Sequence, residues 1–271
     1  CDSCEKRARF RSCACSALSL PVPLAQTGRM DNLTALALAE SAARVSRDLL
    51  RAGGGVAESA IGRDIKLQQD KASEALIIAA LREAAPFPVL SEEAGWIGGQ
   101  PAPGEAWWAV DPLDGSWNFF RGVPLCCVSV ALCRDDKAVL GAIYDFNRDE
   151  LFSGGPGLGF RQDGMPVEPP ARPRAVLSTG LPAKADHSPE GLARVIGRFE
   201  GWTKIRMIGS AALSLAWVAC GRFDGYEEEG INWYDVAAGC ALVEAAGGEI
   251  AITGEVGGPM HVRAVSGRAP S

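Results

Sequence analysis

The chain has 271 residues, of which 47% are hydrophobic and 22% charged, the composition of a globular protein with a sizeable core. Its net charge of −6 argues against nucleic acid as a partner, because nucleic-acid phosphates bind basic surfaces. No apolar run is long enough to cross a membrane. The sequence holds two histidines, which disfavours a histidine nucleophile or a histidine-rich metal site.

The nine cysteines fall into two groups. Four of them lie within the first fifteen residues, in a segment without clear periodicity, and we expect residues 1–29 to be a disordered extension. The alternative for that group is a zinc site formed by Cys1, Cys4, Cys13 and Cys15. The other five lie in apolar stretches, where reduced cysteine packs as a small hydrophobic residue, and this predicts a cytoplasmic protein.

The predicted elements of the first half begin with helices. Apolar residues at helical spacing predict one helix from Asp31 to the glycines at 53–55 and a second over 70–85. Apolar runs bounded by turn residues predict strands over 87–93, 106–111, 126–133 and 138–145, then short strands and turns over 150–167.

After the proline-rich segment 166–173, predicted strands alternate with helices, the pattern of an α/β fold. The predicted order is strand 175–180, helix 188–201, strand 203–209, helix 210–221, helix 234–246 and strand 249–253.

Two acids stand three residues apart in Asp111-Pro-Leu-Asp114-Gly115, at the end of an apolar strand. Proline favours an extended backbone before it and glycine permits a tight turn, so both carboxylates can point into one pocket. Like charges so close repel unless one is protonated or a cation lies between them, and oxygen ligands suit Mg²⁺. The alternative interpretation is an ordinary solvated turn.

The spacing of the residues disfavours other kinds of phosphate chemistry. An aspartyl-phosphate enzyme needs two aspartates two residues apart, whereas these are three apart. Only Cys1 and Arg7 have the spacing of a cysteine phosphatase, and they lie in the extension without a strand or helix around them. The glycine-rich loop of nucleoside-triphosphate sites is missing.

Three motifs, in order along the chain, carry a resemblance to a known family. They are SEEAG (91–95), DPLDGSWNF (111–119) and WYDVAAG (233–239). With them the sequence resembles the inositol monophosphatase family, Mg²⁺-dependent and lithium-sensitive phosphatases, from about Asp31 to about Val265. The resemblance implies a layered αβαβα fold and a homodimer. Residues 30–165 would form a metal-binding α+β half and residues 166–271 an α/β half with the substrate wall, together one catalytic unit.

The resemblance also implies the site residues. Two to three Mg²⁺ ions would be held by Glu92, Asp111, the Leu113 carbonyl, Asp114 and Asp235. The catalytic residues would be Asp111, Glu92 and Ser116, the last two orienting the attacking water. The substrate would be bound by Asp114, Gly115, Ser116, Ala211, Glu228 and Asp235, with backbone N–H groups of Gly115 and Ser116 on the phosphate.

Three further residues are candidates. The family has smaller residues where Lys66 and Leu67 stand, near Asp70 and the implied place of a third, weaker metal ion. Lys66 either forms a surface salt bridge or points inward, where it would contact phosphate or weaken that third ion. Arg206 would support the substrate wall, from its own subunit or from a partner.

The predicted function is therefore hydrolysis of a small phosphomonoester, with myo-inositol 1-phosphate as first candidate. The alternatives within the family are histidinol phosphate, fructose 1,6-bisphosphate and 3′-phosphoadenosine 5′-phosphate. An alternative of another class is a regulatory binding protein without catalysis. No nucleic-acid or membrane partner is expected.

Overall fold

The computed structural model describes residues 30–61 and 64–267, except for the side chains of Ile61 and Asp64. The predicted extension 1–29, with its four cysteines and the zinc alternative, lies outside the described residues.

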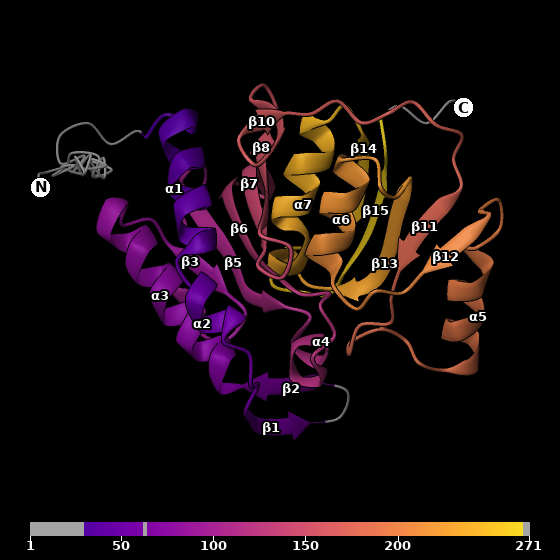
Figure 1. Ribbon diagram of the computed structural model, residues 1–271, viewed down its shortest axis with the longest axis horizontal. Coiled ribbons are helices and arrows are strands. Elements are labelled where there is room, and N and C mark those ends of the chain that lie inside the picture. Colours follow the sequence, from indigo (N-terminus) through magenta and orange to yellow (C-terminus); the bar gives the residue numbers. More distant parts are fainter. Residues whose placement is uncertain (1–29, 62–63, 268–271) are drawn as a thin grey trace, which may run out of the picture.

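Helices and sheets alternate in five layers, α-β-α-β-α, as predicted (Figure 1). The first layer holds α1 (Asn32–Arg44), α2 (Arg47–Arg51) and α3 (Gln68–Ala84). The helices α6 (Ala211–Ala219) and α7 (Trp233–Ala245) lie between the two sheets, and α5 (Pro189–Gly197) lies outside the second sheet (Figure 1).

Within residues 30–61 and 64–267, the first sheet has eight strands in the order β10-β9-β8-β7-β6-β5-β3-β4. Neighbours are antiparallel except for the parallel pair β3 and β5. Every residue of β5 is buried, because helices cover both faces of the sheet. The strands are β3 (Val89–Ser91), β4 (Gly95–Ile97), β5 (Ala106–Asp114), β6 (Cys127–Arg134), β7 (Lys137–Asp145), β8 (Glu150–Gly155), β9 (Gly159–Gln162) and β10 (Met165–Pro166).

The second sheet, in the part of the chain that the structure describes, has five strands in the order β12-β11-β13-β15-β14. The strand β11 is parallel to both of its neighbours, and the other pairs are antiparallel. Two of them, β13 and β15, were not among the predicted elements. The strands are β11 (Val176–Thr179), β12 (Lys204–Arg206), β13 (Gly225–Ile231), β14 (Glu249–Thr253) and β15 (Met260–Val265).

Several boundaries differ from the prediction. The first predicted helix is two, α1 and α2, with a break at Val45 and the buried Ser46. The strands β1 (Ala57–Ile61) and β2 (Asp64–Leu67) precede α3 and pair in antiparallel fashion. The helix α3 begins two residues before Asp70, because the Asp70 carboxylate accepts the backbone N–H of Leu67 and so caps it.

The core lies on both faces of the first sheet, against α1 and α3 on one side and against α6 and α7 on the other. The cysteines in the apolar stretches are buried free thiols, as predicted for Cys126, Cys127, Cys133, Cys220 and Cys240. Among the described residues, no helix has both the length and the apolar character that a bilayer crossing requires.

Candidate active site

The strand β5 ends in an irregular stretch that carries the central motif. Asp111 lies opposite Ser129 and Asp114 opposite Cys127, so the two residues between the aspartates share one residue of β6. The strand thus continues past Pro112, beyond its predicted end. The Pro112 carbonyl accepts a hydrogen bond from the buried Ser73 hydroxyl at 2.8 Å, which fixes the bulge against α3.

Gly115 connects the bulge to the short helix α4 (Ser116–Arg121). Its φ of 90° lies in the region that favours glycine, and a Cβ there would lie 2.8 Å from the Leu125 carbonyl oxygen. No larger residue therefore fits this corner of the motif.

Three carboxylates meet beside the bulge. Oxygens of Glu92, Asp111 and Asp235 lie within 4.8 Å of one another. Glu92 follows β3, which runs parallel to β5, so both strands deliver their acids at the same sheet edge. Asp235 comes from the first turn of α7, where its carboxylate accepts the backbone N–H of Asn232 at 2.9 Å.

Burial and mutual repulsion make this cluster unfavourable as three separate charges. Burial raises the pKa of Asp111 and of Glu92 well above their usual values, and neighbouring carboxylates raise them further. Burial and the nearby Asp114 raise the pKa of Asp235 to about 7. A hard divalent cation would remove the repulsion and take oxygen ligands from all three residues, so the donor set fits Mg²⁺.

Asp114 is not one of these three; it contacts the start of α6. Its carboxylate accepts the Ser210 hydroxyl at 2.6 Å and the backbone N–H groups of Ala212 and Ala211 at 2.7 and 3.4 Å. Burial raises its pKa, and these donors partly offset that effect.

Ser116 connects the central motif to α3. Its hydroxyl donates to the Leu113 carbonyl at 3.0 Å, and it lies 3.4 Å from a carboxylate oxygen of Asp70. Burial raises the pKa of Asp70 to about 7. Ser116 thus lies between a predicted metal-ligating carbonyl and a buried acid.

A cavity of about 480 Å³ joins the predicted residues. Nine of them line it: Glu92, Asp111, Leu113, Asp114, Gly115, Ser116, Ala211, Glu228 and Asp235. Glu228 reaches it from β13, and burial together with the charges of Asp114 and Asp235 raises its pKa to about 8.

The three further candidates differ in where they lie relative to the cavity. Lys66 lines the cavity, with its ammonium 2.6 Å from a Glu93 oxygen and 3.8 Å from a Glu92 oxygen. Asp70 lies behind Ser116 and does not line it. Arg206 is exposed on the edge strand β12, outside the cavity of its own chain.

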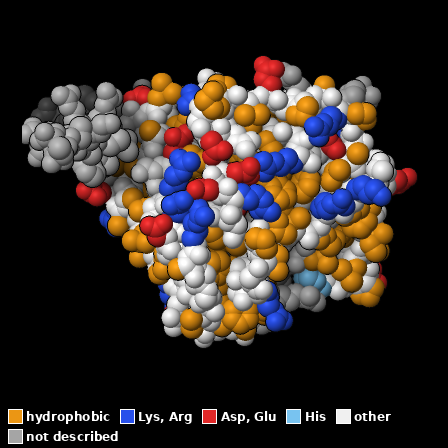
Figure 2. Space-filling model, in the orientation of Figure 1, with side chains coloured by type: hydrophobic (Ala, Val, Ile, Leu, Met, Phe, Trp, Pro, Cys, Tyr) orange, Lys and Arg blue, Asp and Glu red, His pale blue; other side chains and the backbone are white. Residues whose placement is uncertain are grey.

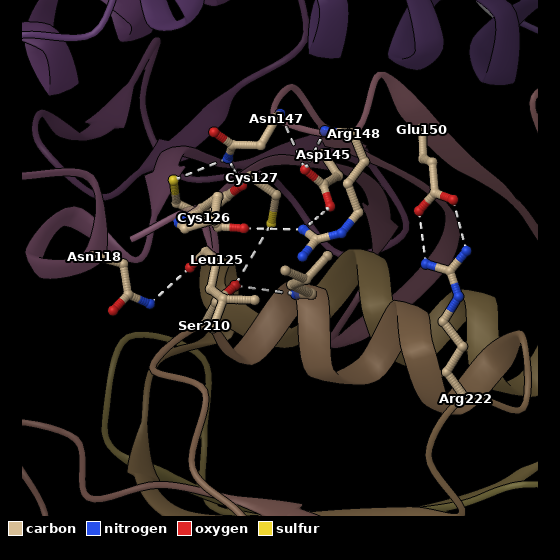
Figure 3. Close-up of polar contacts among 12 residues, drawn as sticks. Asn118, Leu125, Cys126, Cys127, Asp145, Asn147, Arg148, Glu150, Ser210 and Arg222 are labelled. Carbon is tan, nitrogen blue, oxygen red and sulfur yellow. Dashed lines mark hydrogen bonds and ion pairs between the residues drawn. The ribbon is translucent and has the colours of Figure 1, made fainter. Parts of the chain in front are cut away.

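Three supporting residues were missed in the sequence. Lys184 lines the cavity and donates to the Asn232 side chain at 2.8 Å, and Asn232 in turn holds Asp235. Asn118 donates from its amide to the Leu125 carbonyl (Figure 3) and to the Ile208 carbonyl, both at 2.7 Å, and so joins α4 to the segment before α6. Asn232 could have been found from the sequence, because it lies three residues before Asp235, the spacing of a helix cap. Nothing in the sequence points to Lys184.

A family model described as the inositol monophosphatase family matches residues 31–269. The chain belongs to the inositol monophosphatase family. Inositol-1-monophosphatase of Mesorhizobium japonicum is 37% identical over 190 residues, which cover 68% of this chain and 71% of that protein. Nus factor SuhB of Escherichia coli strain K12 is also 37% identical over 190 residues, covering 68% and 70%.

Solved structures of the inositol monophosphatase family share the fold. The inositol monophosphatase from Anabaena sp. PCC 7120 superposes with a TM-score of 0.74 at 33% identity, over 87% of this chain and 92% of that one. The family comprises metal-dependent phosphatases, and the cluster of Glu92, Asp111 and Asp235 could hold a metal ion.

Proposed function

We propose that this protein is a Mg²⁺-dependent phosphomonoesterase that hydrolyses myo-inositol 1-phosphate or a similar small polyol phosphate. The observation that carries the proposal is the group of three mutually close carboxylates, Glu92, Asp111 and Asp235, in a cavity that Asp114 and Glu228 also line. Such a set of buried and partly buried acids is costly without a cation and has no evident structural purpose.

In this proposal Glu92, Asp111, the Leu113 carbonyl, Asp114 and Asp235 hold the metal ions. Bound Mg²⁺ would supply a water of lowered pKa and would stabilise the leaving oxygen. Glu92 accepts hydrogen bonds from the attacking water and the Ser116 hydroxyl positions it.

The remaining groups bind the substrate. Gly115 and Ser116 line the cavity, and in this proposal their backbone N–H groups contact the phosphate, while Ala211 and Glu228 face the alcohol. A covalent enzyme intermediate is not required, and Cys127, whose thiol lies 3.8 Å from a carboxylate oxygen of Asp114, is unsuited to form one. Burial raises the pKa of the Cys127 thiol well above its usual value, so it stays protonated.

Glu228 supports a polyhydroxylated substrate, because a buried carboxylate accepts hydrogen bonds from hydroxyl groups. Within the family, the same cavity is also compatible with histidinol phosphate, fructose 1,6-bisphosphate or 3′-phosphoadenosine 5′-phosphate. The name inositol-1-monophosphatase of the relative from Mesorhizobium japonicum favours the inositol phosphate.

The name Nus factor SuhB, carried by several relatives, favours a second candidate, a regulatory role through binding. One face of the protein argues against direct nucleic-acid binding. On the face shown in Figure 2, Lys and Arg side chains lie among Asp and Glu side chains. Paired examples are Arg47 with Asp149 at 2.7 Å and Arg222 with Glu150 at 2.6 Å.

We place the enzyme in the cytoplasm as a homodimer; its buried free thiols support a reducing compartment.

The test measures phosphate release from inositol 1-phosphate, histidinol phosphate, fructose 1,6-bisphosphate and 3′-phosphoadenosine 5′-phosphate, with Mg²⁺ and with EDTA. The variants are Asp114→Asn and, as matched control, Asp136→Asn in the exposed turn between β6 and β7. We expect Mg²⁺-dependent turnover that falls more than about 100-fold in Asp114→Asn and stays unchanged in the control. Folded protein without turnover on any substrate would favour the binding role.

A further inference from the structure

Lys66 brings a fixed positive charge to the acidic side of the cavity. Its ammonium lies 2.6 Å from Glu93 and 3.8 Å from Glu92, and Glu92 belongs to the three-carboxylate cluster. The Glu93 side chain is only 7% exposed, and the Lys66 side chain is 31% exposed. This is a partly buried ion pair, in which charges interact more strongly than at an open surface.

The backbone around Lys66 fixes the direction of its side chain. Ile65 and Leu67, on either side of it in β2, are buried, and side chains alternate along a strand, so Lys66 points the other way. The strand is held at its end by the hydrogen bond from the Leu67 N–H to Asp70 at 2.7 Å. Lys66 is therefore aimed at the cavity that it lines.

We infer that the Lys66 ammonium is a resident cation of the site, which takes the place that a divalent ion would occupy between Glu92 and Glu93. This inference rests on the proposed metal-dependent function and deepens it, because it makes Lys66 the residue that sets how many ions the site binds. With Lys66 in place, Glu92, Asp111 and Asp235 would still hold divalent ions, but one ion fewer than the carboxylates alone would allow.

Sterics and charge both support this assignment. A Mg²⁺ ion bound to Glu93 would need an oxygen at about 2.1 Å, on the same carboxylate that the ammonium already contacts. The ion and the ammonium would also repel each other at short range. Lys66 also interacts with Asp70. The charge of Lys66 lowers the pKa of Asp70, although burial has the larger, opposite effect. One lysine thus partly neutralises the acids on this side of the cavity.

The experiment counts metal ions rather than activity. Metal-free wild type and Lys66→Met are titrated with Mn²⁺, the free ion being followed by its EPR signal and the heat by calorimetry. Lys66→Arg is the matched control, because it keeps the charge, and Lys66→Gln replaces Lys66→Met if the latter does not fold. We expect Lys66→Met to bind one more Mn²⁺ per chain than wild type, or at least one ion about 10-fold more tightly, and Lys66→Arg to match wild type.

A double variant locates the extra ion. In Lys66→Met with Glu93→Gln the additional Mn²⁺ should be lost, since one of its two carboxylates is gone. Unchanged number and affinity in Lys66→Met would overturn the inference and leave Lys66 as a phosphate contact or a structural ion pair. An extra ion that persists in the double variant would also overturn it. Wild type that binds no Mn²⁺ would instead overturn the metal-dependent function itself, and the inference with it.

Discussion

The Asp114 carboxylate accepts a hydrogen bond from the Ser210 hydroxyl at 2.6 Å, although the two residues are 96 positions apart. The bond joins the end of β5 to the start of α6, and hence the first sheet to the helices between the sheets. Ser210 also caps α6, because its hydroxyl oxygen accepts the Leu213 N–H at 3.3 Å. The helix α6 cannot shift without turning Asp114, so the packing of the middle layer sets the orientation of an active-site acid.

We therefore expect Ser210→Ala to lower both stability and turnover. Loss of the cap and of the bond to Asp114 should cost about 1–3 kcal/mol of the free energy of unfolding, measured by urea denaturation. The freed Asp114 carboxylate should reduce kcat/KM about 10-fold or more. Ser188→Ala is the matched control, because Ser188 caps α5 in the same way, accepting the Gly191 N–H at 3.1 Å, away from the cavity. Equal losses of activity in both variants would contradict the prediction.

The Asn118 side chain provides a second test of how the site is held. Asn118→Ala leaves the carbonyls of Leu125 and Ile208 without the amide donor that lies 2.7 Å from each, which should cost about 1–3 kcal/mol of stability. Asn147→Ala is the comparison, since its amide contacts Cys126 only at 3.4 Å (Figure 3). In urea denaturation, Asn118→Ala should lose more of the free energy of unfolding than Asn147→Ala. If Asn118→Ala loses less than Asn147→Ala, the bonds of Asn118 do not hold α4 in place.

Much of the fold was predictable because its signals are local. The two helices of the first layer have helical apolar spacing, and the buried strands are apolar runs with turn residues between them. The strand β13 was missed because three consecutive glutamates resemble a solvated loop. In the structure Glu227 and Glu229 pair with Arg198, while Glu228 turns to the cavity, so the strand alternates although its residue types do not.

The sequence predicts which acids belong to the site more readily than it predicts that they lie close together. The motifs named Glu92, Asp111 and Asp235, but only the parallel pairing of β3 and β5 and the cap of α7 bring their oxygens within 4.8 Å. The contact of Asp114 with α6 and the direction of Lys66 depend on packing between distant segments, which leaves no pattern along the chain. Arg206 lies outside the cavity of its own chain, and its support of the substrate wall from a partner subunit stays a prediction.

The raised carboxyl pKa values predict how stability of the metal-free protein depends on pH. Burial raises the pKa of Glu228 from 4.5 to about 8, so the folded state keeps a proton that the unfolded chain releases. The contribution of Glu228 to the free energy of unfolding is largest below about pH 4.5 and is lost as the pH rises through about 8. In EDTA the Tm should therefore fall by about 5 °C or more between pH 5 and pH 8, because each 1 kcal/mol moves Tm by about 2–4 °C at this size.

Added Mg²⁺ should raise the Tm more at pH 8 than at pH 5. The reason is that Asp235, with a pKa raised to about 7, must lose its proton before it can bind a cation. Calorimetric melts at both pH values, with EDTA and with Mg²⁺, check this. A metal-free Tm that stays level or rises with pH would mean that these acids are solvated in solution.

Glu228 should determine which alcohols the site accepts. Glu228→Gln replaces a charged acceptor with an amide, so kcat/KM for inositol 1-phosphate should fall about 10-fold, the equivalent of about 1.4 kcal/mol in transition-state binding. Turnover of p-nitrophenyl phosphate, which offers no hydroxyl to Glu228, should change less than about 2-fold. The control is Glu229→Gln, one residue along β13 but paired with Arg198 outside the cavity. Equal losses on both substrates would assign Glu228 to the fold or to the metal ions, not to the alcohol.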